Sequence, residues 1–307
     1  MGSPDFAVPT LDALHESGRY APALVVSQPD RPRGRGQVRV PTPTRARAMD
    51  HEIPTAQMSK SNYDAVVEQI RDLAPDVVVV VAFGIIVQSD LLDLPPYGCI
   101  NVHASLLPRH RGVSPIQAAI LAGDSETGCT TMHMNEGVDT GGILLREATG
   151  IAPADTAGSL MDRLAGLGAQ LLIRTLDGLF AGTLSAVEQE DSPTPYTRKI
   201  KKRHGRIDWT LSAAQLARSV RAMTPWPSAF TFAGGKRLIV LEASVGNPRG
   251  PTPGTILELD PLTVACSEGS LVLHRVKPDG RKSMSAAAFL TGHRFETGNR
   301  FGDEPDD

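Results

Sequence analysis

The chain has few cysteines, and their arrangement indicates neither a disulfide framework nor a zinc site. Cys99, Cys129 and Cys266 are scattered, odd in number and never spaced as C-x-x-C, which fits a reducing, cytoplasmic environment. No apolar run reaches membrane-spanning length, and no charged-then-apolar leader opens the chain, so we expect no membrane partner. The net charge of −3 argues against wholesale coating by nucleic acid, although a local basic face remains compatible with it.

The length of 307 residues, 41% of them hydrophobic, accommodates two domains with real cores. Residues 76–82 form a continuous apolar run, as expected of a parallel strand covered on both faces. Short strands separated by turns between 237 and 276 indicate a small barrel of the OB kind. We therefore predict an α/β protein with a Rossmann-like, doubly wound, mostly parallel sheet in residues 1–190. A basic linker (191–206) and a C-terminal OB-like β-barrel domain (207–307), ending in a disordered tail, would follow.

The start of the sequence differs from that of a usual doubly wound domain. Residues 1–4 indicate a loop and residues 6–17 a helix, whereas such a sheet normally begins with a strand before that loop. The first strand is therefore expected to be missing, which leaves its two neighbours with unpaired backbone groups. We predict that a chain with about eight more residues, a typical strand plus a start, melts at a higher temperature.

Residues 98–115 contain the most informative polar pair. Cys99, Ile100 and Val102 indicate a short buried strand, on which Asn101 and His103 point to the same face. Open α/β sheets bind ligands at the carboxyl ends of their strands. An amide that can donate to an oxyanion and an imidazole that can move a proton suggest acyl transfer there. The alternative is two polar residues that satisfy a turn.

A longer pattern favours the first interpretation. Asn101-x-His103-x-Ser-Leu-Leu-Pro, followed by Asp139 in a Gly-rich loop, resembles the signature of the formyltetrahydrofolate-dependent formyltransferases. Residues 2–6, 28–32, 225–227 and 253–256 extend the resemblance over nearly the whole chain, most closely to the members that act on methionyl-tRNA.

The resemblance implies a reaction and a set of site residues. A formyl group would pass from 10-formyltetrahydrofolate to the free amino group of initiator methionyl-tRNA, without a metal. Asn101 would donate to the oxyanion, Asp139 would orient His103, and His103 would act as base or as electrostatic partner. A zinc site at His103 and Asp139 is disfavoured, since Asn is a poor ligand and no Cys or second His joins them. The implied folate contacts are Phe83, Gly84, Ile85, Ser105, Leu106, Leu107 and Pro108.

Two basic segments are the candidate tRNA contacts. Residues 28–39, too rich in Pro and Gly for helix or strand, carry Arg31, Arg33 and Arg35, and this segment is similar to the tRNA-contacting insertion of the family. The second segment carries Arg198, Lys199, Lys201, Lys202 and Arg203. Solvated charged loops are the alternative for both.

The first domain alone leaves other acceptors open. Glycinamide ribonucleotide and sugar amines are acceptors of related enzymes, water is the acceptor of a deformylase, and a non-catalytic RNA-binding protein is a possibility of a different class. Residues 109–111 would face RNA, folate or solvent. We expect a monomer.

Overall fold

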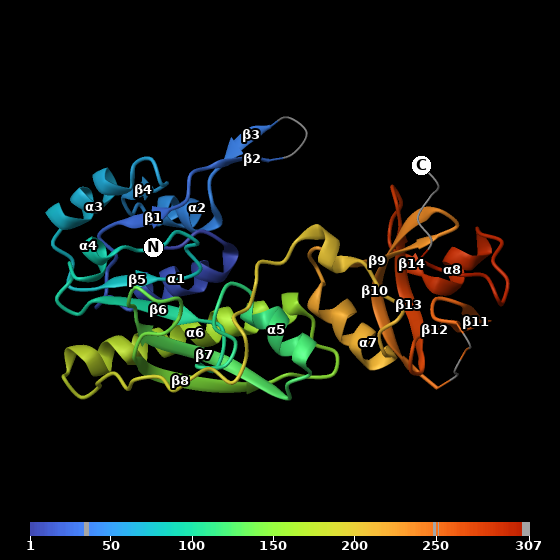
Figure 1. Ribbon diagram of the computed structural model, residues 1–307. Helices are drawn as coiled ribbons and strands as arrows, with labels where there is room; N and C mark the ends of the chain where they lie inside the picture. The colour runs from blue at the N-terminus through green and yellow to red at the C-terminus, as the bar shows by residue number, and fades with distance from the viewer. Residues whose placement is uncertain (34–36, 248–249, 251, 303–307) are drawn as a thin grey trace. The chain divides into compact units, whose positions relative to one another are not determined.

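The computed structural model describes residues 1–33, 37–247, 250 and 252–302. These residues form two compact units (Figure 1). The first contains Met1–Pro115, Glu126–Gly150 and Met161–Arg198, and the second Ile116–Ser125, Ile151–Leu160 and Lys199–Asp307. The domain limits at 190 and 206 stay a prediction. The predicted disordered tail begins at Gly302, whose amide donates to the Phe232 carbonyl, and its remaining residues 303–307 lie outside the described residues, as does Arg35.

The first unit contains a mixed sheet, in which antiparallel strands join the parallel ones that the sequence predicted. Strands β5 (Val78–Val80), β6 (Cys99–His103), β7 (Glu126–His133) and β8 (Ile143–Gly150) pair in that order, with β5–β6 parallel and β6–β7 and β7–β8 antiparallel. Strands β1 (Val25–Ser27) and β4 (Thr55–Gln57) form a separate parallel pair. Most of β8 alternates between half-buried and exposed positions, the pattern of a strand with one solvated face, which antiparallel sheets tolerate.

The helices follow the expected apolar periodicity. In α3 (Tyr63–Asp72) the buried residues recur every three or four positions. Helix α6 (Ala157–Phe180) packs on β6, where a side chain on Gly168 would overlap the Val102 methyl. The remaining helical segments of the first half of the chain are η1 (Asp5–Ala7), α1 (Val8–Glu16), α2 (Pro43–Asp50), α4 (Ser89–Leu92) and α5 (Pro115–Ala122).

The arm at residues 28–39 is not entirely irregular, which corrects the sequence-based prediction. Strands β2 (Arg31–Arg33) and β3 (Val38–Val40) form an antiparallel hairpin in which Pro32 pairs with Arg39. Proline removes one backbone donor, and a two-stranded ribbon tolerates that loss because each strand keeps a free edge.

The first two residues lie between β1 and β5. The Gly2 amide donates to the Val26 carbonyl (3.0 Å), and the Val81 amide donates to the Met1 carbonyl (2.9 Å). A cavity of about 620 Å³ adjoins them, lined mainly by apolar side chains that include Leu11, Val25, Val26, Val78, Leu176 and Phe180. None of the candidate site residues lines this cavity.

The second unit is built on an antiparallel sheet. Its strands pair in the order β11 (Ile256–Leu259), β12 (Leu262–Ala265), β13 (Ser270–Pro278), β10 (Lys236–Gly246) and β9 (Ala229–Ala233), and β14 (Met284–Ser285) pairs with β13. A closed barrel is not found among the described residues. The unit also holds η2 (Lys202–Gly205), α7 (Ala213–Ala222), which begins at a Ser212–Gln215 capping box, and α8 (Ala286–Thr291).

Candidate active site

Strand β6 presents Asn101 and His103 at one edge of the sheet. Val102 contacts α6, and side chains alternate along a strand, so Asn101 and His103 point to the opposite face. The parallel register pairs Val80 of β5 with Asn101. The loop that follows β5 and the loop that follows β6 therefore leave the sheet at the same edge.

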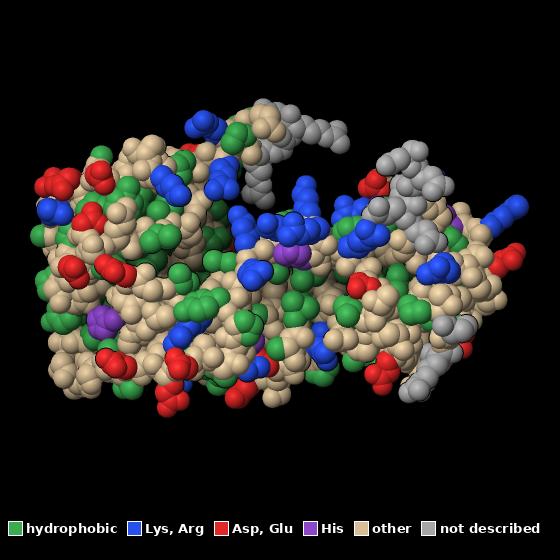
Figure 2. Space-filling view, in the orientation of Figure 1, with side chains coloured by type: hydrophobic (Ala, Val, Ile, Leu, Met, Phe, Trp, Pro, Cys, Tyr) green, Lys and Arg blue, Asp and Glu red, His purple; other side chains and the backbone are tan. Residues whose placement is uncertain are grey.

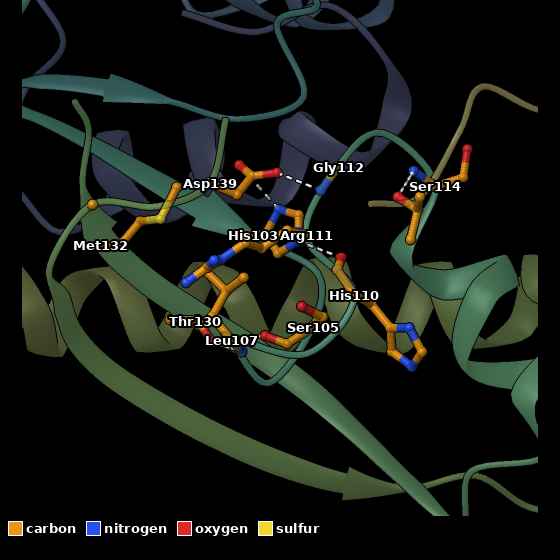
Figure 3. A network of polar contacts seen from close by, with 12 residues as sticks. His103, Ser105, Leu107, His110, Arg111, Gly112, Ser114, Thr130, Met132 and Asp139 are labelled. Atoms are coloured by element: carbon orange, nitrogen blue, oxygen red, sulfur yellow. Dashed lines mark hydrogen bonds and ion pairs between the residues drawn. The ribbon is translucent and has the colours of Figure 1, made fainter. Parts of the chain in front are cut away.

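His103 lies between two hydrogen-bond acceptors (Figure 3). Its Nε2 is 3.2 Å from the main-chain oxygen of His110, and its Nδ1 is 3.6 Å from Oδ1 of Asp139. The side chain is only 7% exposed, so these contacts are shielded from water. A neutral imidazole can donate to one of the two oxygens, whereas a protonated ring can donate to both.

Asp139 reaches His103 from the loop between β7 and β8. Its second carboxylate oxygen, Oδ2, accepts a hydrogen bond of 2.7 Å from the Gly112 amide. Asp139 has a φ of +54°, an uncommon left-handed conformation for a residue other than glycine. The structure thus brings together His103 and Asp139, which are 36 residues apart in sequence, with Asn101 on the same strand as His103.

The Ser105–Pro108 segment divides into buried and partly exposed residues. Ser105 Oγ donates to the Arg109 carbonyl (2.6 Å), and the Leu107 amide donates to Thr130 Oγ1 (3.1 Å). Both side chains are buried, whereas Leu106 and Pro108 are partly exposed. Ser105 and Leu107 therefore shape the turn, and Leu106 and Pro108 can contact a ligand directly.

The Phe83–Ile85 loop is anchored by a buried side chain and a hydrogen bond to its main chain. Phe83 is buried in the core, and its carbonyl accepts a hydrogen bond of 2.8 Å from Gln28 Nε2. Gly84 has a φ of +73° and is exposed, and Ile85 is half-buried. Of the three, Gly84 and Ile85 can meet a ligand with little rearrangement.

Neither nearby thiol provides a nucleophile. Burial raises the pKa of Cys99, at the start of β6, and of Cys129, on β7, to about 12 in each case. Both therefore stay protonated at neutral pH. Within the described part of the chain, no group of three or more His, Cys, Asp or Glu residues could hold a metal ion. No helix in that part has the length and apolarity that a membrane crossing needs.

Sequence reasoning missed Gln189 at the site and gave Arg111 the wrong surroundings. Arg111 is 8% exposed and donates to Oε1 of Gln189 through both Nε (3.1 Å) and a terminal nitrogen (2.8 Å). The expectation that residues 109–111 face RNA, folate or solvent is wrong for Arg111, because its guanidinium is used inside the protein. Gln189 lies 78 positions from Arg111 in a polar stretch without periodicity, and no local sequence signal identifies it.

The candidate tRNA contacts are exposed where they are described. Arg198, Lys199, Lys201, Lys202 and Arg203 form an almost continuous exposed run around η2, and Lys and Arg side chains gather on the face drawn in Figure 2. Arg31 donates to Gln28 Oε1 (2.8 Å), and the acid beside it, Asp30, forms an ion pair with Arg45. Arg35 and the side chain of Arg33 lie outside the described residues.

The fold and the site together define the class of protein. A mixed α/β sheet with an amide, an imidazole and a carboxylate at one strand end indicates an enzyme of acyl-group transfer. Residues 1–176 match the formyl transferase family and residues 199–294 match the formyl transferase C-terminal domain, so the chain belongs to the formyl transferase family.

Named relatives and solved structures agree with this assignment. The methionyl-tRNA formyltransferase of Geobacter sulfurreducens is 47% identical over 99% of this chain and 96% of its own length. An N-formyltransferase from Helicobacter canadensis, solved with folinic acid and dTDP-3-aminofucose, is 17% identical with a TM-score of 0.63, covering 89% of this chain and 96% of its own. HypX from Aquifex aeolicus, solved with tetrahydrofolic acid, is 16% identical with a TM-score of 0.58, covering 79% of this chain and 43% of its own. The two structural likenesses show a shared fold.

Proposed function

We propose that this enzyme transfers the formyl group of 10-formyltetrahydrofolate to the α-amino group of initiator methionyl-tRNA. The observation that carries the proposal is the 47% identity to a methionyl-tRNA formyltransferase over 99% of the chain. This identity spans both family regions, so it includes the second unit as well as the unit that holds His103 and Asp139.

Asn101, His103 and Asp139 are the proposed catalytic groups. The α-amine of an aminoacyl ester titrates near or below about 8, so much of it is already a neutral nucleophile at neutral pH. Its nitrogen forms the new bond to the formyl carbon, the bond from that carbon to N10 of the folate breaks, and the amine proton passes to the departing nitrogen. Asn101 donates to the oxygen that gains negative charge as the amine attacks. A single donor of this kind typically contributes about 10²–10³ in rate.

His103 moves the proton or stabilises the developing charge. The Asp139 carboxylate faces Nδ1 and fixes the ring, and the His110 carbonyl faces Nε2. Once the ring has taken up the amine proton, it can donate to both of these oxygens. The partly exposed residues Leu106, Pro108, Gly84 and Ile85 are the proposed direct contacts of the folate, supported by the buried partners Ser105, Leu107 and Phe83.

The acceptor would be bound through phosphate contacts. Arg31, Arg33 and Arg35 of the arm and the exposed run from Arg198 to Arg203 supply cations that suit an RNA backbone. We further propose that the sheet of the second unit is an OB-like barrel. In support, residues 300–301 bridge to both edges of the sheet: Phe301 pairs with Ala233 of β9, and Arg300 pairs with Thr255, the residue before β11. A cytoplasmic location and a monomeric state complete the proposal.

Acceptor competition tests the proposed function. The enzyme is incubated with labelled 10-formyltetrahydrofolate and equal concentrations of initiator methionyl-tRNA, elongator methionyl-tRNA and a UDP-amino sugar. The proposal predicts that label enters initiator methionyl-tRNA at the highest kcat/KM. Label in the amino sugar with none in either tRNA would refute the acceptor assignment.

A further inference from the structure

We propose that Gln189 is a positioning residue that holds the Asp139 carboxylate against His103. The proposal rests on the proposed function for its catalytic consequence, and on hydrogen-bond geometry for the positioning itself. Every residue involved belongs to the first unit.

Gln189 uses both ends of its side-chain amide to join two loops. Its Nε2 donates to the main-chain oxygens of Asp139 (3.0 Å) and Gly141 (2.7 Å), which flank the turn after β7. Its Oε1 accepts both hydrogen bonds from Arg111 in the loop after β6. An amide has two donor hydrogens and one acceptor oxygen, so a residue with only acceptors or only donors cannot make this set of contacts.

The contact to Asp139 falls where the backbone needs support. A non-glycine residue at φ +54° stores strain, and such a conformation persists only when its surroundings over-determine it. The hydrogen bonds from Gln189 fix the carbonyl of Asp139 and that of Gly141, two residues further on. The direction of the Asp139 side chain therefore depends on Gln189.

The segment that follows Gln189 also fixes the second oxygen of the Asp139 carboxylate, Oδ2. Thr197, eight residues after Gln189, pairs in parallel with Gly112, and its amide donates to the Arg111 carbonyl (2.7 Å). Thr197 Oγ1 accepts from the Ser114 amide (3.0 Å). These contacts aim the Gly112 amide at Asp139 Oδ2, so residues 189–197 hold both the backbone and the carboxylate of Asp139.

An isosteric substitution separates positioning from bulk stability. Gln189→Glu keeps the shape and the acceptor towards Arg111, and adds an ion pair with that buried guanidinium. It also replaces the two donors with a carboxylate oxygen that faces the carbonyls of Asp139 and Gly141, which is repulsive. We expect a kcat lower by about 10–100-fold, a KM for folate within about threefold, and a melting temperature close to that of the wild type. The control is Glu190→Gln, the converse change at the next residue, whose side chain is exposed.

A second readout does not depend on activity. The Gly112 amide donates to Asp139, and its rate of hydrogen exchange is measured by NMR in isotopically labelled protein. Gln189→Glu should lower its protection at least about tenfold, while Glu190→Gln leaves it unchanged. Unchanged protection would overturn the positioning, and reduced protection with an unchanged kcat would overturn its catalytic consequence. Failure of the wild type to formylate methionyl-tRNA would refute the proposed function alone, since the exchange measurement still decides whether Gln189 positions Asp139.

Discussion

Replacing Gly112 with alanine tests the geometry that supports the candidate active site. Gly112 has a φ of +106°, and a Cβ atom there would lie 2.5 Å from the carbonyl oxygen of Thr197 and 2.9 Å from its nitrogen. Both are backbone atoms and cannot rotate away, so the loop must move. The movement draws the Gly112 amide away from Asp139 Oδ2.

The expected cost has two parts. The left-handed backbone conformation is about 1–2 kcal/mol less favourable with a side chain, and the lost hydrogen bond to a charged carboxylate contributes about 1.5–3 kcal/mol. Gly112→Ala should therefore lower the free energy of unfolding by about 2.5–5 kcal/mol. Because a displacement of about 1 Å near the reacting groups can cost about 10²-fold, kcat should fall by a similar factor.

Gly18→Ala is the matched control. Gly18 also has a positive φ, +65°, but no atom lies within 4 Å of its would-be Cβ. The Gly18→Ala variant should lose only the conformational part of the free energy of unfolding, about 1–2 kcal/mol, and keep the kcat of the wild type. Urea unfolding and steady-state formylation measure both quantities. The reasoning is refuted if Gly112→Ala is no less stable than Gly18→Ala and retains wild-type kcat.

Three further changes have defined outcomes. Asn101→Ala should lower kcat by about 10²–10³ while folate affinity, measured by fluorescence titration, stays within about tenfold; full activity would remove Asn101 from the mechanism. Arg35→Ala and Arg203→Ala should each weaken methionyl-tRNA binding. Each should also reduce the slope of log binding constant against log salt concentration by about one, since each removes one proposed phosphate contact. An unchanged slope would show that the side chain is solvated and does not contact the tRNA. Burial lowers the pKa of the Met1 amine from 8.0 to about 6, so the unfolded chain takes up this proton before the native protein does as the pH falls. Stability, measured by urea unfolding, should then drop by about 2 kcal/mol between pH 8 and pH 6, and an unchanged stability would contradict this assignment.

The parts of the site that depend on local pattern could be predicted from the sequence. Two-residue spacing on a buried strand places Asn101 and His103 on one face, and strand ends mark ligand sites in open sheets. The role of Asp139 could be predicted only through the family resemblance, because no pattern in the surrounding sequence indicates that Asp139 contacts His103.

Other features depend on contacts between distant parts of the chain. Gln189 and Thr197 act on residues about 50–85 positions away through backbone carbonyls and amides, and backbone groups carry no sequence signal. The antiparallel direction of β7 and β8 was missed because an apolar strand has the same local pattern in either direction. The β2–β3 hairpin was missed because the prolines and glycines around it outweighed its short alternation.

The central claim is that His103 and Asp139 act together in formyl transfer to methionyl-tRNA. Single-turnover rapid quench with 10-formyltetrahydrofolate and initiator methionyl-tRNA, comparing the wild type with Asp139→Asn, tests it most directly. Asparagine keeps the shape but removes the charge that faces Nδ1 of His103. The account predicts formylmethionyl-tRNA from the wild type and a chemical step slower by about 10²-fold or more in the variant, with folate affinity within about tenfold. A variant that formylates at the wild-type rate would contradict it.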